Sequence, residues 1–302
     1  MKYTLIFSAA LMLILNSCEK TEKVDNFPKH NSKLVTNCFF NADTSFIFNL
    51  SRSLSPIDNA PFRNMNSSNA YIKIFEENVL FDSIKFNSLY NCFHGDFSKL
   101  PSKNKYYRFE CYYPGYPKVS GEDYIPEDIS ISSSSGYHTI QNLMKYNDTI
   151  SYANYTGYLN IKINSNSNLS DKYIILKLFK KKRYSGTNYF NNSPIFSEEI
   201  SNINESESIG EQLFISNENN IKEIKLKWEK SYEFLVNNKI DDEYEIEITT
   251  CSKNSYEYIK RYKLQTFNAD DPFSEPTPIS NNIINGYGIF GGISVKTHFI
   301  KL

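Results

Sequence analysis

Short runs in which apolar and polar residues alternate recur along the first half of the chain. The runs span residues 34–53, 69–87, 90–94 and 105–117, and the run 69–87 is expected to hold two strands with a turn at residues 76–78. Period-two alternation with frequent turn residues is typical of the short strands of a sandwich. The pattern predicts an N-terminal β-sandwich domain over residues 33–131, of the immunoglobulin-like or transthyretin-like kind.

The second half of the chain has longer alternating runs. In residues 221–230, for example, Ile224, Leu226 and Trp228 alternate with lysines and a glutamate. Residues 155–164, with Tyr158 opposite Leu159, and residues 242–250 alternate in the same way. Such alternation indicates antiparallel strands with one face in solvent. The run SSSSG at 132–136 reads as a linker or long loop. We therefore expect a separate C-terminal β domain over residues 132–302, so that the whole chain is all-β with two sandwich domains.

One helix is predicted in the C-terminal domain, over residues 254–265. Asn254 or Ser255 is expected to cap its N-terminus, because short polar side chains accept hydrogen bonds from the first free backbone N–H groups. Tyr258, Ile259 and Tyr262 form a stripe at helical spacing.

The N-terminus carries a basic Lys2 and an apolar run from Leu5 to Leu15, too short to span a membrane. This pattern predicts a signal peptide over residues 1–17. The residues Leu15-Asn16-Ser17-Cys18 resemble a bacterial lipobox, in which the cysteine is lipidated after cleavage. We expect Cys18 to carry the lipid and the polar residues 18–32 to form a flexible tether. An ordinary secretory signal with a chance cysteine is the alternative.

Composition adds two constraints. The formal net charge of −1 over 302 residues suggests neither nucleic acid nor an anionic membrane surface as a partner. An exported chain is permitted disulfides. Cys92 and Cys111 flank an expected hairpin turn near residues 100–104 and could therefore pair. Buried free thiols are the alternative, since four cysteines besides Cys18 allow three connectivities.

No residue pattern indicates catalysis or a metal site. The four histidines are far apart, and no HExxH, GxSxG or Gly-rich phosphate loop is present. Adjacent carboxylates such as Glu122-Asp123 are expected to be solvated or to form turns. We therefore predict no enzyme activity, no cofactor and no metal. The basic block 180–183 is expected on the exposed arm of a hairpin. Tyr112, Tyr113 and Tyr116 could form an aromatic platform for a partner or a sugar ring.

The C-terminal stretch DPFSEPTPISNNIINGYGIFGG, residues 271–292, resembles the ending of a family of Bacteroidota lipoproteins known only as domain of unknown function 4249. LSRSLSPIDNAPF at 50–62 and GEDYIPEDISI at 121–131 resemble other parts of that family. Gly288, Gly291 and Gly292 permit close backbone approach around Tyr287 and Phe290. The two aromatic residues lie either on a glycine-rich bulge of the last strand or on a loop that presents them to a partner.

The resemblance implies an accessory lipoprotein of the outer membrane, often associated with TonB-dependent nutrient receptors. We therefore expect a non-enzymatic binding protein, lipid-anchored at the cell surface or on the periplasmic face. Two alternatives remain: a stand-alone structural or adhesion module, and a hydrolase with an unrecognised carboxylate site. A deep pocket with converging carboxylates would favour the hydrolase, and a flat aromatic patch would favour binding.

Overall fold

A computed structural model gives the fold of the chain. It describes residues 30–55, 65, 69–148, 150–164, 172–184, 187–193, 205–217, 223–236, 243–269, 271 and 273–302. Residues Ser32–Leu302 form one compact unit. Within the described residues, no helix is both long enough and apolar enough to cross a membrane.

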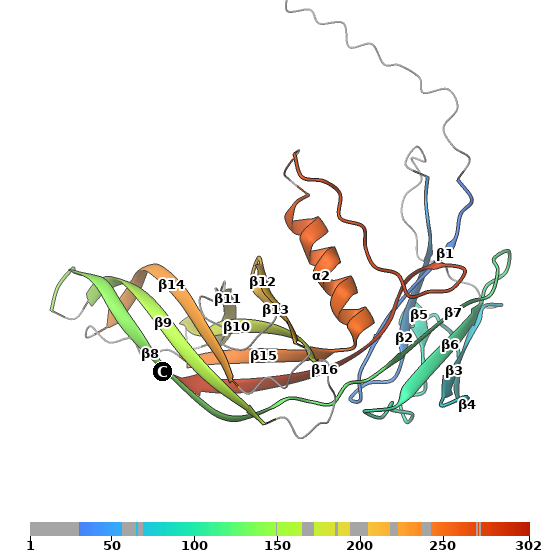
Figure 1. Cartoon of the computed structure of the whole chain (residues 1–302), viewed down its shortest axis with the longest axis horizontal. Helices are drawn as coiled ribbons and strands as arrows, with labels where there is room; N and C mark the ends of the chain where they lie inside the picture. Colours follow the sequence, from blue (N-terminus) through green and yellow to red (C-terminus); the bar gives the residue numbers. More distant parts are fainter. Residues whose placement is uncertain are drawn as a thin grey trace, which may run out of the picture. The chain divides into compact units, whose positions relative to one another are not determined.

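Most of the described residues lie in strands, and one α-helix accompanies them (Figure 1). The strands of the first half are β1 (Leu34–Phe40), β2 (Ile47–Arg52), β3 (Tyr71–Glu76), β4 (Val79–Asn87), β5 (Cys92–His94), β6 (Tyr106–Tyr112) and β7 (Val119–Tyr124). Those that follow are β8 (Ser130–Lys145), β9 (Ile150–Asn164), β10 (Lys172–Tyr184), β11 (Thr187–Ser193), β12 (Glu205–Ile209), β13 (Gln212–Asn217), β14 (Glu223–Val236), β15 (Glu243–Cys251) and β16 (Tyr287–Lys301). The helix is α2 (Lys253–Phe267), between β15 and β16.

The described strands form two sheets. Thirteen strands share one sheet, in the order β12-β13-β10-β15-β16-β1-β2-β5-β4-β3-β6-β7, with β11 beside β10. The pairing of β1 with β16 is parallel, whereas the other pairings are antiparallel. The second sheet has three strands in the order β14-β9-β8. The last strand of the chain therefore lies between the strands of the first half and those of the second.

The strands of the first half share one core with β16. Buried side chains of β1 to β7 make up most of this core, which we call the first core, and Phe290 of β16 and Ile283 complete it. Phe290 stacks on Phe40, with 4.4 Å between the ring centroids. Aromatic rings dominate this core because Phe and Tyr bury large apolar areas and pack well on pleated strands.

A second core lies between the two sheets. The predicted inward residues Ile224, Leu226 and Trp228 of β14 are buried there, against Tyr244 and neighbouring residues of the large sheet. Trp228 lies over Gly157 of β9, where a Cβ atom would come within 2.2 Å of the indole ring. Only glycine leaves room for the ring at this position. The alternation predicted for β9, β14 and β15 is therefore confirmed.

The helix α2 covers the opposite face of the large sheet. Tyr256 is buried against Phe214 of β13 and Ile175 of β10 in a third core. The predicted helix is confirmed, but its predicted cap is wrong. Ser252 is the N-cap and accepts a hydrogen bond from the Ser255 N–H group. Of the predicted stripe, Tyr258 and Ile259 are partly buried and Ile259 packs against the third core, whereas Tyr262 is 51% exposed.

The predicted linker at 132–136 is also wrong. These residues belong to β8 and pair with β9. Ser and Gly are common in loops, but here the long partner strand β9 supplies the backbone hydrogen bonds that hold these residues extended.

The predicted fold class is confirmed as mostly β with one helix. The predicted number of sandwiches is not confirmed, because one hydrogen-bonded order runs through both halves of the chain. The domain boundary at residue 131 stays a prediction.

Candidate functional site

The outer face of the β14-β9-β8 sheet carries a hollow lined by aromatic, amide and basic side chains. On β9, Leu159 and Ile161 point into the second core. Because side chains alternate along a strand, Tyr158 and Asn160 point to the opposite, outer face. Strand register places Tyr137 and Lys227 beside Tyr158 in one cross-strand row.

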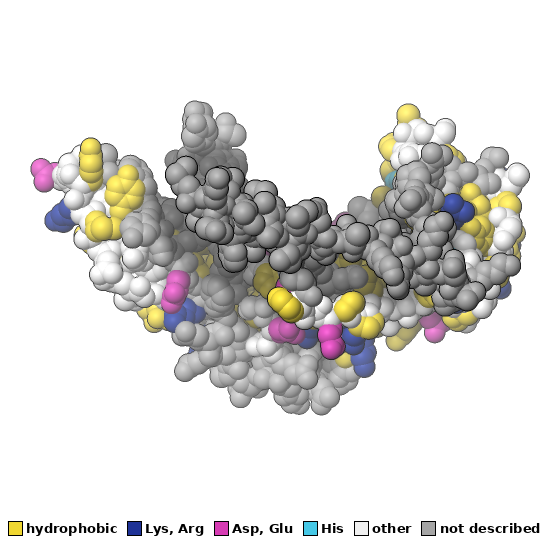
Figure 2. Space-filling view, turned by 90° about the horizontal axis from the view of Figure 1, so that it is seen from above, with side chains coloured by type: hydrophobic (Ala, Val, Ile, Leu, Met, Phe, Trp, Pro, Cys, Tyr) yellow, Lys and Arg dark blue, Asp and Glu magenta, His cyan; other side chains and the backbone are white. Residues whose placement is uncertain are grey.

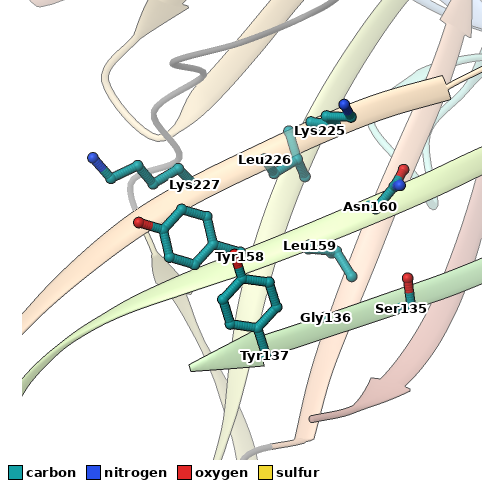
Figure 3. A pocket seen from close by; sticks show the side chains of 9 residues that line it. All are labelled: Ser135, Gly136, Tyr137, Tyr158, Leu159, Asn160, Lys225, Leu226 and Lys227. Carbon is teal, nitrogen blue, oxygen red and sulfur yellow. The ribbon is translucent and has the colours of Figure 1, made fainter. Parts of the chain in front are cut away.

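A second row lies directly beside the first and contains Ser135, Asn160 and Lys225. The two rows line a hollow of about 740 Å³ (Figure 3). We call this hollow the sheet-face groove and define it by Ser135, Tyr137, Tyr158, Asn160, Lys225 and Lys227. Its volume lies within the ordinary range for ligand pockets.

Two tyrosine rings form the aromatic part of the sheet-face groove. The rings of Tyr137 and Tyr158 stack with their centroids 4.8 Å apart and their planes 22° apart. Tyr137 is 61% exposed, whereas Tyr158 is partly buried. Stacking of this kind stabilises a sheet, and it also leaves an aromatic surface open to solvent.

The polar groups of the groove differ in how well they are paired. Asn160 donates its Nδ2–H to Glu223, but its Oδ1 atom is buried and has no hydrogen-bond partner among the described residues. Lys227 lies 3.7 Å from Glu229, measured from Nζ to Oε1. Lys225 is exposed. No carboxylate belongs to the described residues that line the groove.

Tyrosine, amide, hydroxyl and ammonium groups line the groove, and this combination suits stacking, hydrogen bonding and charge pairing with a ligand. The described part of the chain also contains no group of three or more His, Cys, Asp or Glu side chains that could hold a metal.

The prediction that Phe290 contacts a partner is wrong. Phe290 is fully buried in the first core, where it stacks on Phe40 and Phe48. Tyr287, on the same strand, is 41% exposed, and Lys33 Nζ lies 4.8 Å from its ring centroid. The glycines around Phe290 lie in the last strand, in continuous register with β1 and not in a loop, and Gly288 has a φ of 116°. Only Tyr287 of this pair remains available to a partner.

The three tyrosines near Pro114 do not form a single flat platform. Tyr112 stacks on Tyr71 at 4.8 Å and donates its hydroxyl hydrogen to Glu110. Tyr113 and Tyr116 meet edge to face, at 5.9 Å and 79°, and pack against the first core. A turn between Tyr113 and Tyr116 holds this geometry. Their role as partner contacts stays a prediction.

Of the two alternatives for Cys92 and Cys111, the structure shows free thiols rather than a disulfide, although only Cys111 is fully buried. The hairpin that would have joined them does not form. Cys92 lies on β5, which pairs with β2 and β4, and Cys111 lies on β6, which pairs with β3 and β7. Cys18 lies outside the described residues.

A buried carboxylate was missed by the sequence analysis, which expected Glu122-Asp123 in solvent. Asp123 is only 4% exposed and accepts hydrogen bonds from Ser252 Oγ and from the Gly292 and Tyr124 N–H groups. Burial raises the pKa of its carboxyl group to about 6, although these hydrogen bonds act in the opposite direction. All three donors are protein groups, so the Asp123 side chain links β7 to the N-terminus of α2 and to β16.

Charges on the described surface are mixed. On the face seen in Figure 2, Lys and Arg side chains lie near Asp and Glu side chains rather than in a separate field. The predicted hairpin arm for residues 180–183 is confirmed for the backbone, because β10 pairs there with β11.

The fold and the groove define a mostly β protein with a pair of stacked tyrosines at an open hollow on one sheet face. The family model described as "Domain of unknown function (DUF4249)" matches residues 20–298. The chain belongs to this family. A comparison with curated proteins gives no match.

One solved structure is similar over 73% of this chain and 89% of its own, with 9% identity and a TM-score of 0.16. It is described as the complete structure of manganese lipoxygenase of Gaeumannomyces graminis and the partial structure of zonadhesin of Komagataella pastoris. A TM-score this low carries no argument about fold or activity.

Proposed function

We propose that the protein is a lipid-anchored, non-enzymatic binding protein of the outer membrane that works beside a TonB-dependent nutrient receptor. The observation that carries this proposal is the sheet-face groove, in which stacked Tyr137 and Tyr158 are open and no described lining residue is a carboxylate. An open aromatic face suits binding, whereas hydrolysis would need positioned acid and base groups.

The anchoring part of the proposal rests on the lipobox. Cys18 would carry several acyl chains, and the binding free energy of about 0.8 kcal/mol for each buried CH₂ group makes such an anchor stable. The polar residues 19–32 would then hold the folded unit away from the bilayer. Accessory proteins placed in this way can pass a ligand to a neighbouring transporter.

A stand-alone adhesion module is the second candidate, and one observation favours it. Apolar side chains are exposed near the turn that joins β8 to β9. These are Ile140, Leu143, Met144, Tyr146 and Tyr152. Exposed apolar groups gathered in one region mark protein contact surfaces.

Purification of the native lipoprotein from mildly solubilised outer membranes tests the proposal. We expect a TonB-dependent receptor to co-purify in stoichiometric amount, and a Cys18→Ser variant to lose both the lipid and the membrane association. A membrane-bound lipoprotein that runs alone would contradict the accessory role and favour the adhesion module. Membrane association of Cys18→Ser would contradict the lipid anchor.

A further inference from the structure

We propose that the sheet-face groove binds an acidic glycan, that is, a chain of sugar rings that carry carboxylate or sulfate groups. The inference rests on the proposed function only in taking this groove as the ligand site. Three features within two adjacent cross-strand rows support it: an exposed ring, an unpaired acceptor and two ammonium groups.

The exposed ring is that of Tyr137. One face of this ring stacks on Tyr158, and β8 pairs with no described strand other than β9. The other face of the ring is therefore accessible from the free edge of the sheet. A tyrosine ring presents a large, flat, apolar face with a polar tip, which matches the C–H face and hydroxyl rim of a sugar ring.

The unpaired acceptor is Oδ1 of Asn160. Its Nδ2 group is held by Glu223, which fixes the orientation of the amide and leaves Oδ1 without a partner among the described residues. A buried acceptor without a donor is costly, and native structures rarely keep one without a reason. A ligand hydroxyl is a donor of the required kind. The exposed Ser135 hydroxyl lies next to Asn160 in the same row and can bond a second ligand hydroxyl.

The ammonium groups belong to Lys225 and Lys227, at alternate positions on β14 and hence on the same face. Glu229 pairs with Lys227, and Glu223 is bonded to Asn160. Lys225 is exposed and forms no ion pair with a described carboxylate. The nearby carboxylates are thus engaged, and the groove favours an anionic group at Lys225.

A nucleic acid strand also offers rings and negative charges, but the groove suits it less well. Nucleic acid sites neutralise several successive phosphates with a row of basic side chains. The groove has two lysines, Lys225 and Lys227, and Lys227 is paired with Glu229. The acidic glycan is therefore the better match.

Calorimetric titration of the full, detergent-solubilised lipoprotein tests this inference. The probes are short oligogalacturonate chains, chondroitin sulfate oligosaccharides, methyl-esterified oligogalacturonate and an oligothymidylate. We expect an acidic oligosaccharide to bind, and methyl-esterified oligogalacturonate, which lacks only the charge, to bind at least about tenfold more weakly. Binding to chondroitin sulfate but not to oligogalacturonate would identify sulfate as the preferred anion.

Matched variants assign the binding to the groove. Tyr137→Ser and Lys225→Gln should each weaken binding at least about tenfold. Tyr106→Ser and Lys85→Gln are the controls and should bind as the wild type does. Tyr106 is 61% exposed, like Tyr137, and also meets a cross-strand tyrosine, Tyr124. Thermal midpoints within about 2 °C of the wild type would show that the variants are folded.

Several results would overturn the inference. These are no binding of any acidic oligosaccharide, equal binding of the esterified and acidic chains, equal binding of the oligothymidylate, and equal loss in groove and control variants. If a receptor co-purified but no acidic oligosaccharide bound, only the assignment of the ligand as an acidic glycan would be wrong. If an acidic oligosaccharide bound but no receptor co-purified, only the proposed accessory role beside a receptor would be wrong.

Discussion

Asp123 shows how one buried residue can couple stability to pH. Its carboxyl pKa is raised from 3.8 to about 6, chiefly by burial. Between these two values the folded protein binds a proton that the unfolded chain does not. The stabilisation from the raised pKa is therefore complete below about pH 4 and is lost as the pH rises through about 6.

We predict that Asp123→Asn removes this pH dependence, because the amide does not titrate. Between pH 4 and pH 7 the wild type should lose about 2–3 kcal/mol of unfolding free energy relative to the variant, from the free energy equivalent of the pKa change. Urea unfolding across this range measures the difference. The exposed Asp43→Asn is the control and should follow the wild type. Parallel curves for Asp123→Asn and the wild type would contradict the prediction.

The cysteines differ in burial and hence in reactivity. Burial raises the pKa of Cys111 to about 12 and raises those of Cys38 and Cys251 further. Cys92 is only partly buried, although burial also raises its pKa. The thiolate is the reactive form, so access and pKa together favour reaction at Cys92.

We predict that a thiol reagent modifies only Cys92 in the native protein near pH 8. In the unfolded protein without reductant, all four of these cysteines should react, because none is in a disulfide. Mass spectrometry of the labelled peptides measures both results. If Cys92 and Cys111 stayed unreactive in the unfolded protein, this result would contradict the prediction and indicate a disulfide between them.

At the scale of elements, the helix α2 depends on a cap that lies before its predicted start. Ser252 accepts the Ser255 N–H bond with its side chain and donates its hydroxyl hydrogen to Asp123. Ser255 in turn donates to the carbonyl of Gly292 on β16. At Gly292 a Cβ atom would lie 1.9 Å from the Tyr124 carbonyl oxygen, so only glycine permits this approach.

We predict that Ser252→Ala destabilises the fold by about 1–3 kcal/mol, from the lost cap and the lost donor to Asp123. Asn254→Ala should cost less than about 0.5 kcal/mol, because Asn254 is exposed and caps nothing. Urea unfolding of both variants distinguishes the two positions. A larger loss of stability for Asn254→Ala than for Ser252→Ala would contradict the prediction and indicate that Asn254 caps the helix.

At the scale of the whole molecule, β16 joins residues far apart in the chain. It pairs in parallel with β1 and antiparallel with β15, and its Phe290 completes the first core. The strands of the first half therefore depend on a segment near the end of the chain.

We predict that Phe290→Ala costs about 3–5 kcal/mol, because it removes a fully buried ring. Phe299→Ala on the same strand is the matched control and should change little, since Phe299 is 65% exposed. Denaturant unfolding measures both costs, with tyrosine fluorescence and far-UV circular dichroism as probes. Similar costs for the two variants would mean that Phe290 is not part of a shared core.

Local patterns predicted much of the strand inventory, because alternation and turn residues act over a few neighbours. The turn at Glu77 and Asn78 illustrates this, since both residues have positive φ where the sequence places a break between β3 and β4. Short local motifs likewise predicted the family, and the family model that matches residues 20–298 confirms this prediction. The groove was not predicted: alternation puts Tyr158 on the face opposite Leu159 and Ile161, but it cannot place Tyr137 or Lys225 beside Tyr158.

The sequence by itself determined the class of fold, the inward faces of β9, β14 and β15, the presence of α2 and the family. These follow from the period of apolar residues and from short motifs, which need no knowledge of distant contacts. The tertiary structure alone decided the parallel pairing of β1 with β16, the burial of Asp123 and Phe290, the free state of Cys92 and Cys111, and the rows of the sheet-face groove. Each of these depends on which strands become neighbours, and strand pairing is set by contacts between residues far apart in the chain.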